Sequence, residues 1–180
     1  MPNCCHDDKF PCRIATRLIR IYDGGLRETR DSYSLPLEFV TAPIYPLTLT
    51  SASFEGKATV TNVSVGNSRG NRRLVDVDYT FPVTVIYVDA NGVTGRAYTS
   101  ISGSISAFLR LPDQAYSVEL GVSFISRTGR ISGDTLQISG CMRMTVRVLT
   151  EFDAVINVSE INYPYLLTPE NLSCSALFDD

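Results

Sequence analysis

Hydrophobic and polar residues alternate along most of the chain, which is the pattern of half-buried β-strands. The longest example runs from Val75 to Tyr87, where every odd position is apolar and most even positions are polar. Pro82 falls on the polar side of this segment, and because it cannot donate to a ladder it predicts an edge position or a bulge. The segment ends in Asp89–Gly92, with the sequence DANG, which is a signal for a hairpin turn.

The same period of two predicts further strands before and after this segment. One covers Tyr116–Phe124, and the strand after Asp134 directs its even positions to the core: Leu136, Ile138, Met142, Met144, Val146 and Val148. Shorter strands are expected at Ile14–Tyr22, Leu35–Thr41, Lys57–Val65, Thr94–Ile101 and Ile105–Leu111, some of them separated by clusters of Gly, Asn and Ser. A helix start signal occurs only at Thr168, where a short helix to about Phe178 is expected. We therefore predict an all-β protein, with an antiparallel β-sandwich or jelly-roll-like domain and an extended N-terminal leader.

Composition and pattern divide the chain into three parts: a Cys-rich N-terminal connector (1–12), a β-sandwich domain (13–160) and a C-terminal tail (161–180). With 180 residues, of which 44% are hydrophobic, the domain can bury a core without disulfides. The net charge of −3 argues against a nucleic-acid partner. We expect no membrane span, because no apolar run reaches about eighteen residues. The N-terminal residues also lack the pattern of a secretory signal.

Residues suited to catalysis are scarce. The single histidine, His6, lies in the leader, whereas a catalytic triad needs an imidazole held beside its nucleophile. There is no nucleophile elbow and no phosphate-binding glycine loop. Asp76 and Asp78 share one face of a strand and are assigned to its solvated side. We predict that the protein is not an enzyme and needs no cofactor.

A structural metal site is the alternative use of the leader. Cys4, Cys5, His6 and Cys12 are all zinc-ligand types, but adjacent cysteines rarely complete one tetrahedral site, and the chain has no second CxxC pair. Zinc therefore ranks below the use of these thiols as cross-links.

Cysteine positions carry the most specific signal in the sequence. Cys4, Cys5 and Cys12 precede the first predicted strand, and five cysteines cannot all pair within one chain. Strand parity turns Cys141 away from the core and Cys174 lies in the tail, so all five are expected to be reachable from outside; burial of Cys141 by a neighbouring element is the alternative. A twelve-residue leader spans at most about 40 Å. We therefore expect intersubunit disulfides, with the leader cysteines as donors and Cys141 and Cys174 as acceptors.

The body of the chain resembles a known family. The stretches VDVDYTFPVTVIYVDANG, YSVELGVSFI and ISGCMRMTVRVLTEFDAVI are similar to the SPOCS-type domain of spore coat and sporulation proteins in clostridia-like endospore formers. The resemblance covers roughly residues 50–158 and leaves the leader and the Cys-bearing tail outside. It implies a function in the spore coat or in sporulation.

The leader resembles a second group of spore proteins. An N-terminal Cys-Cys pair followed by another cysteine looks like the connector of endospore appendage (Ena-type) pilins, which are jelly-roll subunits whose connectors form disulfides to earlier subunits. The resemblance implies a structural protein of the endospore surface that assembles head to tail into a disulfide-cross-linked fibre. It would be made in the mother-cell cytoplasm without a signal peptide and oxidised after lysis. The alternative is a SPOCS-type module that binds other spore proteins without polymerising.

Overall fold

The computed structural model describes residues 13–157, and within them every regular element is a β-strand. The strands are β1 (Arg13–Pro36), β2 (Glu38–Phe39), β3 (Thr48–Lys57), β4 (Thr59–Arg69), β5 (Arg72–Val88), β6 (Thr94–Leu109), β7 (Tyr116–Ser126), β8 (Gly129–Ser132) and β9 (Thr135–Asn157). The prediction of an all-β, antiparallel protein is confirmed. Within the described range, no helix could cross a membrane. The helix expected after Thr168 lies outside the described residues.

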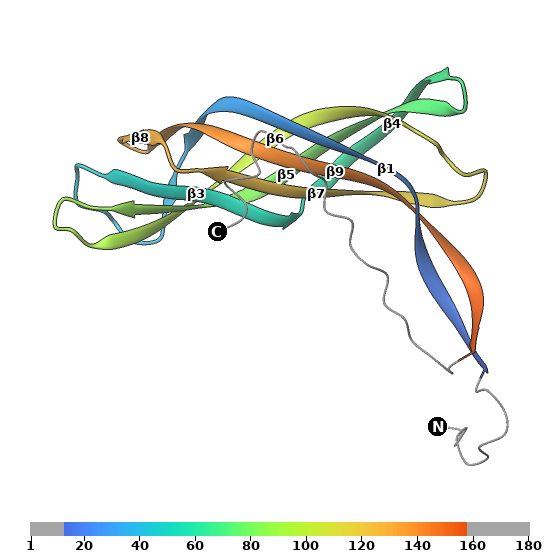
Figure 1. Cartoon of the computed structure of the whole chain (residues 1–180). Coiled ribbons are helices and arrows are strands. Elements are labelled where there is room, and N and C mark those ends of the chain that lie inside the picture. Colours follow the sequence, from blue (N-terminus) through green and yellow to red (C-terminus); the bar gives the residue numbers. More distant parts are fainter. Residues whose placement is uncertain (1–12, 158–180) are drawn as a thin grey trace, which may run out of the picture.

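The strands form one antiparallel sheet in the order β1-β9-β7-β3-β5-β6-β2, with β4 beside β5 and β8 beside β9 (Figure 1). Strand β3 joins the two halves of this sheet, since Thr48–Ser53 pair with β5 while Ala52–Lys57 pair with β7. The sheet folds back on itself so that β1 contacts β6. At this contact, the side chains of Leu109 and Ala107 in β6 lie next to Gly25 in β1. A jelly-roll-like arrangement stays a prediction.

The core consists of the side chains predicted from the alternation. All odd positions of β5 from Val75 to Tyr87 are buried, and so is the predicted even face of β9. Aromatic rings connect the two halves of the sheet: the ring centroids of Phe81 and Phe124 lie 6.2 Å apart, and Phe54 stacks on Phe81 at 5.1 Å. Burial of this continuous apolar layer is the main stabilising contribution to the fold.

Two turn and strand signals correspond to specific features of β5. The expected edge position or bulge at Pro82 is wrong, because β5 is an interior strand and pairs regularly with β6 there, with Pro82 opposite Ser100. On its other side, Thr80 pairs with Thr59 of β4 and Thr84 pairs with Ser53 of β3, so Pro82 lies at the break between these two partners. Its missing N–H therefore leaves no ladder position empty on that side. At the end of β5, the Asp89 carboxylate accepts hydrogen bonds of 2.9 Å from the backbone N–H groups of Asn91 and Val93, which closes the predicted turn.

The expected break at residues 102–104 is wrong. Strand β6 continues through this Ser-Gly-Ser segment, and Gly103 pairs with Tyr79 of β5. A Cβ atom at Gly103 would lie 2.9 Å from the Tyr79 hydroxyl oxygen, so glycine is present to admit the ring and does not mark a turn. Strand β1 is also longer than the expected Ile14–Tyr22, because the polar run after Tyr22 pairs with β9 at the edge of the sheet, where alternation is not required.

Candidate functional site

The most distinctive feature outside the core is a two-stranded ribbon, here called the arm, formed by residues 13–21 of β1 and 149–157 of β9. Figure 1 shows it projecting from the body, in blue and orange, toward the points where the described chain begins and ends. Its register runs from Arg13 opposite Asn157 to Ile21 opposite Leu149. At a rise of about 3.3 Å per residue, the arm is roughly 30 Å long.

Both edges of the arm are open over most of its length. Strand β1 is an edge strand that pairs with β9 alone. On the other side, the pairing of β7 with β9 begins at Tyr116 opposite Thr150, so β9 has no second partner from Glu151 onward among the described residues. An isolated two-stranded ribbon is marginally stable in water. A further strand beside the arm would therefore stabilise it.

A bulge and a polar anchor hold the base of the arm. The register with β9 shifts between Ile21 and Asp23, and such an extra residue bends a strand, which fits the change of direction there. The Asp23 carboxylate accepts hydrogen bonds from the backbone N–H groups of Arg110, at 2.8 Å, and Gly24, at 3.0 Å. Burial acts to raise the pKa of Asp23, but these hydrogen bonds and the Arg110 guanidinium outweigh it, so the pKa is lowered.

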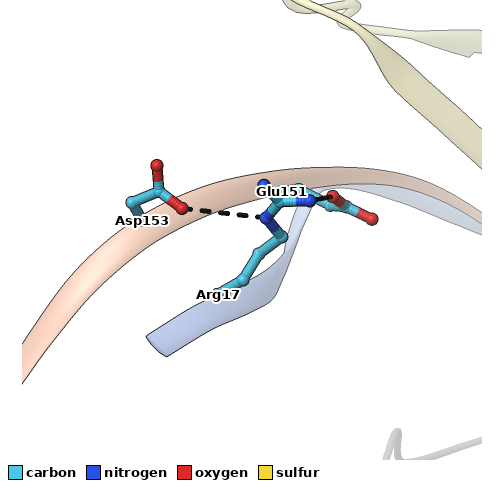
Figure 2. A network of polar contacts seen from close by, with 3 residues as sticks. All are labelled: Arg17, Glu151 and Asp153. Atoms are coloured by element: carbon cyan, nitrogen blue, oxygen red, sulfur yellow. Dashed lines mark hydrogen bonds and ion pairs between the residues drawn. The ribbon is translucent and has the colours of Figure 1, made fainter. Parts of the chain in front are cut away.

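The arm carries exposed charges of opposite sign on its two strands. Arg17 Nη1 lies 3.5 Å from Glu151 Oε2, and Arg17 Nε lies 3.7 Å from Asp153 Oδ1 (Figure 2). These side chains are at least 62% exposed, so each pair contributes little to stability. These side chains give the β1 edge of the arm positive charge and the β9 edge negative charge.

Large apolar side chains on the arm are also exposed. The exposed fractions are 69% for Ile19, 57% for Ile21 and 41% for Phe152. A hollow of about 430 Å³ lies at the arm's base, lined by Ile19, Gln114, Ala115, Tyr116, Ser117, Leu149, Thr150 and Glu151. Ile19 and Ile21 share one face of the arm, whereas Phe152 lies opposite Leu18 on the other face. Neighbouring exposed apolar residues such as the two isoleucines mark contact surfaces more often than isolated ones do. Glu151 is the only acidic or basic residue in this lining, so the hollow lacks the paired groups of acid–base catalysis.

Several acidic and basic residues elsewhere in the described range form ion pairs. Glu119 contacts both Lys57 and Arg147, and Arg143 Nε lies 2.8 Å from Glu28 Oε1. Residues 13–157 contain no cluster of His, Cys, Asp and Glu that could hold a metal ion. The alternative zinc site at Cys4, Cys5, His6 and Cys12 lies outside this range.

Asp76 and Asp78 lie on the outward face of β5, as predicted. Ser106 donates a hydrogen bond to Asp76, and Ser104 donates one of 2.7 Å to Asp78. The Asp78 pKa is lowered by its hydrogen bonds from Ser104 and Asn62. A carboxyl with a lowered pKa stays ionised at neutral pH and is poorly suited to act as a general acid or base there.

The expectation that Cys141 can be reached from outside is wrong. Parity does place it on the face opposite the core, but its side chain is buried, with 7% exposure. Cys141 lies opposite Ile125 of β7 on one side and Arg30 of β1 on the other. The longer side chains of Ile125 and Arg30 flank the short Cys141 side chain, because β9 is an interior strand here. The alternation in the sequence shows only which face of the strand a residue occupies, and not which neighbours cover it.

The other four cysteines lie outside the described residues, but the chain connects them to the arm. Cys12 directly precedes Arg13, the first residue of β1, and Cys174 follows Asn157, the last residue of β9. Because Arg13 pairs with Asn157, the leader and the tail join the body at the same end of the arm. The sequence predicted a strand at residues 14–22 but missed its pairing with the end of β9.

Comparison with known proteins adds no relative from which a function could be taken. No family model, curated protein or solved structure matches this chain. The proposals below therefore depend on the residues and geometry already described.

Proposed function

We propose that the protein is a structural subunit of the endospore surface that self-assembles head to tail into a fibre, with disulfides from Cys4, Cys5 and Cys12 linking successive copies. The observation that carries this proposal is the position of the arm. The leader begins at the outer end of the arm, about 23 Å beyond the last pairing of β9 with β7, and adds a reach of at most about 40 Å. Thiols attached at this point are well placed to meet another copy.

The acceptor thiol is proposed to be Cys174 or a second leader cysteine. A disulfide forms when a thiolate reaches another sulfur, so access to both sulfurs is required. Cys141 is buried within the sheet of its own chain and is not retained as an acceptor. The leader and the tail share an attachment point, so one assembly contact could bring both within reach of a neighbour's arm.

The location belongs to the same proposal. We place the protein on the endospore surface, as part of an extracellular appendage, on the basis of the two resemblances given by the sequence. Synthesis in the mother-cell cytoplasm would keep the thiols reduced, and release on lysis would allow them to oxidise.

A second candidate is a SPOCS-type coat or sporulation module that binds other spore proteins as a monomer. It is favoured by the extent of that resemblance, since residues 50–158 include most of the body from β3 to β9. This module would stay monomeric under oxidising conditions, and its partner surface would be independent of the leader.

Electron microscopy beside reducing and non-reducing gels separates the two candidates. The full chain should form fibres and a covalent ladder after oxidation, and both should be lost when Cys4, Cys5 and Cys12 are replaced by serine. The matched control is Cys141→Ala, which should leave the ladder unchanged. A full chain that remains monomeric after oxidation would exclude the fibre proposal and favour the binding module.

A further inference from the structure

We propose that the arms of successive copies pair edge to edge, with β1 of one arm forming an antiparallel ladder with β9 of the next. This inference rests on the proposed self-assembly and identifies its noncovalent interface. The partner is a second copy of the same chain, and the contact is separate from the disulfides.

The first argument is the two open edges of the arm. From Arg13 to Ile19, β1 pairs only with β9 of its own chain, and the opposing residues of β9, from Glu151 to Asn157, pair only with β1 among the described residues. Each edge presents backbone N–H and C=O groups that another strand can satisfy. The exposed Ile19 and Phe152 side chains would gain cross-strand neighbours on both sides of the ribbon.

The second argument is charge complementarity between these edges. Strand β1 carries Arg17 on the same face of the arm as Glu151 and Asp153 of β9, and it carries Arg20 on the other face, opposite Thr150. Pairing β1 with β1, or β9 with β9, places like charges on adjoining strands, which is destabilising. Pairing β1 with β9 places opposite charges together. The charge pattern therefore favours head-to-tail contacts over a two-fold dimer.

The third argument is register. Within one chain Arg17 lies opposite Asp153 and Leu18 lies opposite Phe152. Moving a copy by two strand spacings, about 9.6 Å, presents the same β9 residues to the free edge of β1 with side chains on the same faces. Strand twist, about 20–25° at each step, would rotate successive bodies away from one another. A contact of this kind does not close on itself and so extends into a filament.

A charge-swap variant tests the pairing without depending on sulfur. Arg17→Glu, Arg20→Glu, Glu151→Arg and Asp153→Arg together exchange the signs of the two strands while keeping the pairing within one chain. Association is measured by energy transfer between two labelled populations of the full chain under reducing conditions. The swapped protein should associate with itself as the wild type does, and mixed association with the wild type should be roughly tenfold weaker or more.

The half-swapped variants complete the test. The pair Arg17→Glu with Arg20→Glu, and the pair Glu151→Arg with Asp153→Arg, should each lose self-association but associate with each other. If the wild type associates with the swapped protein as strongly as each associates with itself, head-to-tail pairing is overturned. If the mixed association is stronger than self-association, head-to-tail pairing is also overturned, and two-fold pairing is indicated instead. If the wild type associates and none of the arm variants changes that association, the arm is not the interface. A covalent ladder that persists in that case would leave the proposed function standing, so the two failures are distinguishable.

Discussion

The backbone N–H of Arg110 donates a hydrogen bond of 2.8 Å to Oδ2 of Asp23, which joins the strand that forms the arm to the end of β6. These residues are far apart in sequence, and their contact lies directly beside the bulge where the arm leaves the body. The Arg110 guanidinium lies 3.6 Å from the same carboxylate oxygen. This anchor fixes the base of the arm relative to the core, so it determines where the leader is presented.

Replacing Asp23 should therefore weaken the fold at a defined place. Asp23→Ala leaves two backbone N–H groups without their acceptor and should lower the free energy of unfolding by about 1–3 kcal/mol. The exposed Asp113→Ala is the control and should change it by less than about 0.5 kcal/mol. Urea denaturation followed by circular dichroism measures both, and equal effects of the two substitutions would contradict the anchor.

The same anchor should respond to acid in one direction. Because the folded-state pKa of Asp23 is lowered, its stabilising contribution is fully present above the ordinary aspartate pKa of about 3.9 and is lost as pH falls through the folded-state value. The stability difference between wild type and Asp23→Ala should therefore be largest near neutral pH and should shrink as pH falls below about 3.9. A difference that does not change with pH would show that the carboxylate charge has no part in the anchor.

A glycine in β9 should tolerate no side chain. A Cβ atom at Gly140 would overlap the ring of the buried Phe124 and lie 3.2 Å from the Ile125 carbonyl oxygen. Gly140→Ala should cost about 1–3 kcal/mol of unfolding free energy. The control is Gly121→Ala in β7, where the nearest atom to the added carbon is 3.9 Å away. Similar costs at both positions would mean that Phe124 can move aside.

The buried position of Cys141 predicts slow chemistry. In a chain whose other four cysteines are replaced by serine, a bulky maleimide should label native Cys141 roughly a hundredfold more slowly than the urea-unfolded protein, because labelling requires local opening. Mass spectrometry over time gives both rates. Native labelling as fast as in the unfolded chain would contradict the burial and restore Cys141 as an acceptor.

The sequence predicted the core well because alternation reports directly on which face of a strand is buried. Val75–Tyr87 and the even face of β9 are buried as expected. The prediction failed at Gly103, where glycine leaves space for the side chain of Tyr79 within a continuous strand. Composition alone cannot distinguish a glycine of this kind from a glycine in a turn. The prediction also failed at Cys141, since burial there depends on strands β1 and β7, which lie on either side of it.

The arm could be predicted only in part. A strand near residues 14–22 follows from the pattern, but its partner lies at the far end of the chain, and single-sequence patterns do not reveal long-range pairing. The sequence does not show that Arg17 lies beside Glu151 and Asp153, so it does not reveal the open edges of the arm or their opposite charges.

The central claim is that the leader cysteines bond to another molecule. The most direct measurement mixes the natural chain with a heavy-nitrogen-labelled chain in equal amounts under reducing conditions, oxidises the mixture, and analyses disulfide-linked peptides containing Cys4, Cys5 or Cys12 by mass spectrometry. The proposal predicts mixed light–heavy pairs about as abundant as the two pure pairs together. Linked peptides that are only all-light or all-heavy, or thiols that stay reduced around a bound zinc ion, would contradict it.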